Sequence, residues 1–173
     1  MDVSLLEREN ALLGQDFLTW LWYRGEKSAG AFETKKGEAF RIAVEQRVSV
    51  QGGEGEMLET ATVQSPRGEL SEARTGLRTG KKVNRAQLKI EQDGVTWQLS
   101  LRAEDFGASS LKTPKIEAPG EGADPDALFL EKLFLIERCL ELLDAAFAEF
   151  LAVRLTRGWP AEARRIKAWV AEP

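Results

Sequence analysis

The sequence predicts an α+β fold, a four-stranded antiparallel sheet with helices packed on one face. Three observations support this prediction. Two pairs of segments alternate apolar and polar residues, as half-buried strands do. A short helical segment separates the two pairs, which gives the order ββαββ. Long apolar segments with helical spacing begin and end the chain.

A first helix is expected over residues 2–24, where Asp2 or Ser4 can cap the first turn. From Phe17 to Tyr23 the apolar residues occupy more than one side of this helix, and such a helix is normally buried. Two interpretations fit these large side chains. They belong either to the core or to a subunit interface, where Trp and Tyr are enriched. The candidate interface residues are Phe17, Trp20, Trp22 and Tyr23.

The first strand pair follows this helix. Glycine, serine and lysine predict a loop over residues 25–37. Residues 40–50 then alternate between apolar and polar, which predicts a strand with one solvated face. A glycine-rich turn leads into a second strand at about residues 57–64, and Pro66-Arg67-Gly68 ends it.

The most informative stretch runs from Leu70 to Leu101. A short helix is expected to begin with Ser71 as its N-cap and to end at Gly80, because a left-handed residue costs least as glycine. The period then changes to two, and Asp93-Gly94 is a strong signal for a hairpin turn. The apolar side of this hairpin comprises Ala86, Leu88, Ile90, Val95, Trp97, Leu99 and Leu101.

The C-terminal part is expected to be helical. Residues 104–125 are rich in glycine, proline and acids, which predicts irregular structure. Asp124 as N-cap and Pro125 as the first helical residue mark a sharp helix start. This helix is expected to run past Arg154 and to stop at Gly158-Trp159-Pro160, with a short final helix after it.

Composition bounds the class of protein. The chain has 173 residues, of which 43% are hydrophobic and 30% charged, as in an ordinary globular domain. We expect residues 1–125 to form the helix-and-sheet unit and residues 126–173 to pack on it as helices, within one structural domain. Charges interrupt the most apolar segment, so no membrane span is expected. Acids follow the first methionine too closely for a signal peptide, and we expect a cytoplasmic protein.

Residue types argue against catalysis. The chain has no histidine and one cysteine, Cys139, which removes the Ser–His and Cys–His nucleophile pairs and the usual zinc ligand sets. No phosphate-binding glycine loop is present. A carboxylate-metal nuclease stays formally open, but only the order Lys-x-Glu occurs, at Lys89–Glu91 and Lys115–Glu117. We therefore expect no enzyme, cofactor or metal ion, and a packed core thiol at Cys139.

Basic residues gather locally in an acidic chain. The net charge is −4, yet seven bases stand against two acids between Pro66 and Ile90. A second group, between Arg154 and Lys167, has five bases and one acid. Basic blocks are most often solvated surface, and bases are favoured at helix C-termini. An anion-binding face is the alternative.

The uncovered side of the expected sheet would present Arg, Lys and Gln without aromatic residues. Such a face suits phosphate contacts, which are independent of sequence and weaken with salt. Because no aromatic side chain is available for base stacking, a duplex is favoured over a single strand. A solvated sheet face without a ligand is the alternative.

Residues 70–88 resemble the C-terminal half of the recombination-associated RdgC family. The residues that carry the resemblance are Leu70-Ser71-Glu72, Leu77, Gly80-Lys81, Val83 and Leu88. The likeness continues into residues 111–116 and the helix opening at residues 126–130, and the order of elements agrees. It covers roughly residues 55 to 153.

The resemblance implies a ring-shaped dimer that threads double-stranded DNA without sequence preference and modulates recombinase filaments. It also implies basic contacts in the loop before residue 71. Arg67 keeps that character, whereas Pro66 and Gly68 depart from the expected Lys and Gln. The chain begins near the middle of the family's length. We therefore expect a homo-oligomer, or a hetero-oligomer with a chain that supplies the N-terminal half, associated with the nucleoid.

From the sequence we expect a non-enzymatic protein that binds double-stranded DNA and is associated with recombination. The alternative is a protein–protein scaffold that binds a separately encoded partner through its first helix without contacting DNA. The expected DNA-binding residues are Arg41, Arg47, Arg67, Arg78, Lys81, Lys82, Arg85, Lys89 and Arg102.

Overall fold

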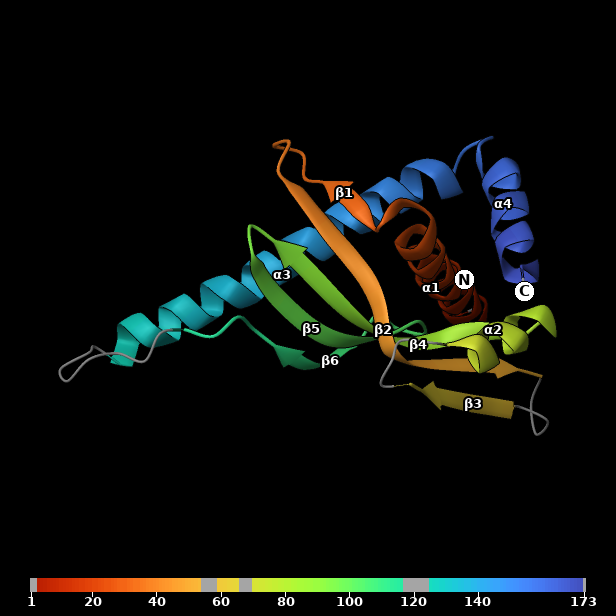
Figure 1. The fold of residues 1–173 in the computed structure, drawn as a ribbon, viewed down its shortest axis with the longest axis horizontal. Helices are drawn as coiled ribbons and strands as arrows, with labels where there is room; N and C mark the ends of the chain where they lie inside the picture. Colours follow the sequence, from red (N-terminus) through yellow and green to blue (C-terminus); the bar gives the residue numbers. More distant parts are fainter. Residues whose placement is uncertain (1–2, 54–58, 66–69, 117–124, 173) are drawn as a thin grey trace.

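A computed structural model describes residues 3–53, 59–65, 70–116 and 125–172, with side chains from residue 11 onward. Within these ranges the chain forms four helices and six strands (Figure 1). In chain order they are α1 (Val3–Ser28), β1 (Ala31–Glu33), β2 (Ala39–Gly52), β3 (Glu59–Gln64), α2 (Ser71–Arg78), β4 (Lys82–Gln92), β5 (Val95–Arg102), β6 (Ala108–Lys112), α3 (Pro125–Arg154) and α4 (Trp159–Ala171).

The six strands form one antiparallel sheet in the order β1-β2-β4-β5-β6. The long strand β2 also pairs with β3, so β1 and β3 lie one after the other along the same edge of β2. The predicted α+β class and antiparallel sheet are confirmed. The predicted number of four strands is wrong, because β1 and β6 extend the expected set β2, β3, β4 and β5.

The two additional strands have weak sequence signals. β1 has three residues and buries only Phe32 among them. β6 buries none of its five side chains fully, and Ser110 within it has a positive φ of 54°. Short edge strands are held by backbone pairing with a neighbour and need little apolar alternation. For this reason both fell in segments that the sequence predicts as irregular.

The hairpin of β4 and β5 agrees with its prediction. Asp93 and Gly94 connect the strands with φ angles of 50° and 80°, as a tight hairpin turn requires. The expected apolar side chains are buried, except Val95 at the start of β5, which is exposed. One cap differs from expectation: Ser71 is the first helical residue of α2, and no side chain caps the N-terminal end there. Asp124 lies outside the described residues.

All four helices lie on one side of the sheet, the inner face, where α1, α2 and α3 contact the strands and α4 packs against the other three helices. The core lies between these helices and the sheet, and Trp20 is at its centre with no exposed surface. Its ring lies 5.8 Å from Phe32 of β1 and 5.5 Å from Phe150 of α3. Its indole nitrogen donates a hydrogen bond to Glu162 of α4 at 3.2 Å. One side chain of α1 therefore contacts the sheet and two other helices.

The expectation of an interface on α1 is corrected by this packing. Phe17, Trp20 and Trp22 are buried in the chain's own core, and Tyr23 is partly buried against it. Trp22 and Tyr23 meet Trp169 of α4 edge-on, with ring centroids 5.3 and 5.8 Å apart. The helix is apolar on several sides because the sheet, α3 and α4 surround it. No described helix combines the length and the apolarity needed to cross a membrane.

The helix α1 lies very close to the sheet at one point. A Cβ atom placed on Gly14 would come within 1.9 Å of the carbonyl oxygen of Ala103, which follows β5. Because the opposing atoms belong to the backbone of Ala103, no change of side-chain rotamer could relieve this overlap. Glycine at this position therefore sets the distance between α1 and the sheet.

We expect Trp20→Ala to lower the free energy of unfolding by about 3–5 kcal/mol, because it opens a cavity among four elements. Urea denaturation measures the change. Leu12→Ala is the matched control on the same helix, since Leu12 is 52% exposed. An equal effect in both variants would contradict the central place assigned to Trp20.

Gly14→Ala is expected to destabilise the protein by about 1–3 kcal/mol or more, through overpacking against Ala103. At a helix position with free space around it, replacing Gly by Ala instead stabilises the protein by roughly 0.5–1 kcal/mol. Gly25→Ala in the same helix is the control, because its added Cβ would meet nothing closer than 3.8 Å. The Tm should fall for Gly14→Ala and rise for Gly25→Ala. If the Tm changes in the same direction in both variants, the close approach of Gly14 to Ala103 is refuted.

Candidate nucleic-acid interface

The side of the sheet opposite the helices, the outer face, carries polar side chains. Alternation along β4 and β5 buries one set of residues against the helices and turns the other set outward. The described outward charged and amide residues are Arg41, Glu45, Arg47, Arg85, Gln87, Lys89, Glu91, Gln98 and Arg102. The sequence predicted this composition of the outer face, but not how its charges pair.

In the middle of the outer face, the positive charge is balanced. Lys89 forms a close ion pair with Glu91, and its Nζ lies 3.9 Å from a carboxylate oxygen of Glu45. Hydrogen bonding to Glu91 raises the pKa of Lys89. Gln98 donates to the other oxygen of Glu45 at 3.3 Å. Lys89, an expected DNA-binding residue, is therefore engaged within the protein.

Positive charge concentrates at one end of the outer face, in a group that we call the basic corner: Arg47, Arg85 and Arg102. Arg85 of β4 is the direct cross-strand neighbour of Arg102 of β5. Like charges directly opposite each other destabilise a strand pair. Arg102 is held by Asp105, with Nε 2.8 Å from Oδ1. Hydrogen bonding to Arg102 lowers the pKa of Asp105.

A bulge in β2 brings Arg47 into this corner. The pairing of β2 with β4 passes from Glu45 directly to Val48, so Gln46 and Arg47 have no partner residue on β4. Gln46 has a φ of 20°, a strained value for a residue other than glycine. Val48 pairs with Ala86, the residue next to Arg85. Among the described residues, no ion-pair or hydrogen-bonding partner engages the guanidinium of Arg47 or of Arg85.

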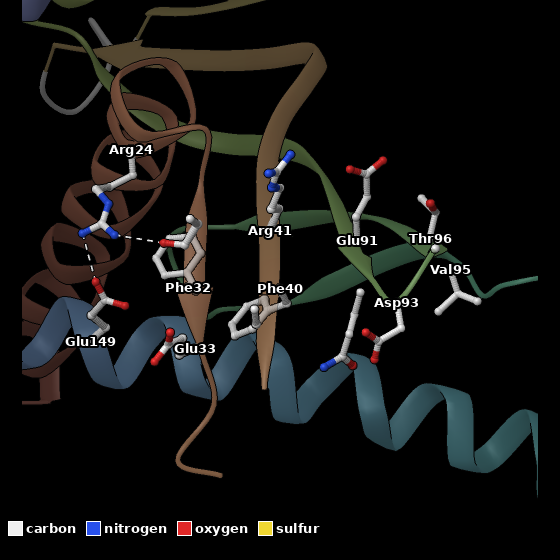
Figure 2. Close-up of a pocket in the computed structure, with 14 residues that line it drawn as sticks. Arg24, Phe32, Glu33, Phe40, Arg41, Glu91, Asp93, Val95, Thr96 and Glu149 are labelled. Atoms are coloured by element: carbon white, nitrogen blue, oxygen red, sulfur yellow. Dashed lines mark hydrogen bonds and ion pairs between the residues drawn. The ribbon is translucent and has the colours of Figure 1, made fainter. Parts of the chain in front are cut away.

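Arg41 lies apart from the basic corner, at the other end of β2. It lines a shallow hollow near β1 and the β4–β5 turn, which Figure 2 shows from close by. Four carboxylates line the same hollow: Glu33, Glu91, Asp93 and Glu149. This surplus of negative charge does not favour a phosphate.

The second arginine that lines this hollow, Arg24, stabilises the fold through contacts within the protein. Its guanidinium lies 2.9 Å from Glu149 and 3.0 Å from the carbonyl oxygen of Ala31 (Figure 2). It also lies 5.1 Å from the ring centroids of both Trp20 and Phe32. Arg24 thus links α1, β1 and α3 through charge and cation–π contacts.

Three expected DNA-binding residues lie elsewhere, in a groove of about 770 Å³ between α1, the end of α2 and α4. They are Arg78, Lys81 and Lys82. Arg78 donates to the carbonyl oxygens of Val170, at 2.7 Å, and Glu172, at the end of α4. Lys81 lies 3.0 Å from Glu59. The expected DNA site is therefore divided between two surfaces, and Arg67 falls outside the described residues.

The described part of the chain holds no group of three or more His, Cys, Asp or Glu residues that could bind a metal ion. Cys139 lies in the core, 1% exposed, and burial raises the pKa of its thiol to about 11. A buried thiol with that pKa is almost entirely protonated at neutral pH and is a weak nucleophile.

Comparisons with family models, with curated proteins and with solved structures found no match to this chain. The surfaces described above and the sequence resemblance are therefore the features of this chain that bear on its function.

We expect Cys139 to react with a thiol reagent only when the protein unfolds. At pH 8, a pKa of about 11 leaves roughly one thiol in a thousand as thiolate, and burial excludes the reagent as well. The rate of reaction with a chromogenic disulfide, compared in buffer and in urea, measures this. Rapid reaction of the folded protein would contradict the burial of this side chain.

Proposed function

We propose that this chain is a non-enzymatic protein that binds double-stranded DNA without sequence preference, through the basic corner of its outer sheet face. The observation that supports this proposal is the charge distribution there. Arg47 and Arg85 have no partner among the described residues, and Arg85 lies directly opposite a third arginine, Arg102 of β5. Guanidinium groups with free donors on a flat face suit the phosphate oxygens of a duplex.

The pairing of Arg85 with Arg102 gives the proposal a physical basis. Two guanidinium groups held opposite each other by strand register repel, and Asp105 compensates only part of this charge. A bound phosphate would offset the remaining repulsion. The absence of exposed aromatic residues among the outward side chains of β2, β4 and β5 favours backbone contacts over base stacking.

The resemblance to the RdgC family points in the same direction. It associates the chain with recombination and with the nucleoid, and it predicts binding that depends on charge and not on base sequence. The basic corner also differs from the expected site, since Arg78, Lys81 and Lys82 lie in the groove beside α4. The proposal therefore assigns DNA contact to the sheet face alone.

A protein–protein scaffold is the second candidate function, and the exposure of α3 favours it. Four large apolar side chains in the first turns of α3 are exposed: Phe129, Leu130, Leu133 and Phe134. Because the aromatic residues of α1 are buried, a partner would bind here and not at the first helix.

Arg47→Ala combined with Arg85→Ala is expected to weaken duplex binding and its salt dependence together. The slope of log affinity against log salt should fall by about 0.9 for each phosphate that the variant no longer neutralises. Fluorescence anisotropy with a labelled duplex at several salt concentrations measures both quantities.

The control for this experiment is Arg157→Ala with Arg164→Ala, which removes the same charge from exposed positions beside and within α4. This control should keep the slope of the wild type. An equal decrease in both variants would contradict the assignment to the sheet face. If the wild type fails to bind any duplex at about 50 mM salt, the proposed function is wrong and the scaffold is favoured.

A further inference from the structure

The first ten residues of α3 project from the molecule and form a segment that we call the α3 tip, residues 125–134. In Figure 1 this end of α3 extends past the sheet, while α2 and α4 lie at the opposite end of the molecule. Side chains on several sides of the tip are exposed, and Phe129 and Phe134 are 67% and 64% exposed. Four large apolar residues on one projecting helical segment are unusual for a surface without a partner.

The groove at the opposite end has complementary properties. One face of α4 and the end of α2 give it an apolar lining, which comprises Leu77, Trp159, Ala163, Ile166 and Val170. Around this lining stand the bases Arg78, Lys81, Lys82 and Lys167, of which Lys81 is paired with Glu59 at 3.0 Å. Its acid, Asp16, is paired with Arg154 at 3.0 Å. The groove therefore combines an apolar floor with a positively charged rim.

We propose that the α3 tip of one chain docks into this groove of a second copy of the chain. In the tip and the turn after it, residues 125–138, acids outnumber bases by one: Asp126, Glu131 and Glu137 stand against Lys132 and Arg138. Arg138 is already paired, with Glu38 at 2.7 Å and Glu141 at 2.9 Å. Acids around an apolar helical surface complement bases around an apolar groove. Amphipathic helices commonly bind such grooves through apolar anchors at helical spacing. Phe129, Leu133 and the adjacent Leu130 and Phe134 would supply the anchors.

The arrangement of the two surfaces makes this contact a head-to-tail one. Because tip and groove lie at opposite ends of the molecule, a chain cannot fill its own groove, and each added copy presents a new tip or a new groove (Figure 1). Such heterologous contacts produce open chains of copies, or closed rings if the rotation between copies permits. The inference does not rest on DNA binding, because the basic corner lies on the uncovered outer face of the sheet.

The test uses two variants that damage one surface each. The tip variant is Phe129→Asp with Leu133→Asp, and the groove variant is Lys82→Glu with Lys167→Glu. All four positions are exposed, so the fold should persist, and circular dichroism checks this. Sedimentation velocity over a concentration series measures association. The wild type should form species larger than a dimer as concentration rises, and each variant alone should associate at least roughly thirtyfold more weakly.

Mixing the two variants distinguishes this contact from other modes of assembly. The groove variant keeps an intact tip, and the tip variant keeps an intact groove, so their mixture should form a discrete dimer and nothing larger. Leu155→Asp is the control for the tip, since Leu155 is exposed at the other end of α3. Arg157→Glu with Arg164→Glu is the control for the groove. Both controls should assemble like the wild type.

Three outcomes would overturn the inference. The first is a wild type that remains monomeric up to about 1 mM, since that excludes even a weak contact between copies. The second is disruption by the tip variant but not by the groove variant, which would indicate that two α3 tips pair with each other. The third is a variant mixture that stays monomeric although both variants are folded.

Discussion

The burial of Trp20 is the contact on which the arrangement of this fold depends. Its ring and its indole nitrogen reach β1, α3 and α4 from α1, so the helical layer is assembled around one side chain. Gly14 allows α1 to lie close enough to the sheet for this to happen. All four helices gather on the inner face, and among the described residues no helix covers the outer face of the sheet. The same packing that forms the core therefore creates the surface that is available to a ligand.

The β4–β5 hairpin and the long helices could be predicted from the sequence because their signals are local. Alternation in residues 84–101 and the turn at Asp93-Gly94 specify the hairpin without help from the rest of the chain. β1 and β6 could not be predicted in this way, because they exist through pairing with β2 and β5. The aromatic residues of α1 were equally ambiguous, since an all-round apolar helix fits a core or an interface.

The candidate site was predicted in its composition but not in its geometry. The bases on the outer face follow from alternation, yet the acids that neutralise Lys89 and Arg102 are brought there by strand register and by a turn. The bulge that exposes Arg47 has no clear sequence signature. Arg78 and Lys81 are near Arg85 in the sequence, but Gly80, with a φ of 90°, turns the chain between α2 and β4. A run of basic residues in the sequence is therefore divided between two surfaces.

One edge of the sheet is divided between β1 and β3, and this division affects whether the edge can pair with a strand of another chain. Neither strand is long, and the bulge in β2 interrupts the edge between them. At the opposite edge, Ser110 distorts the five residues of β6. A sheet whose borders are short and irregular is a poor template for backbone pairing with another chain. Strand pairing between copies is thereby disfavoured, and so is growth of the open polar sheet into an aggregate by strand addition.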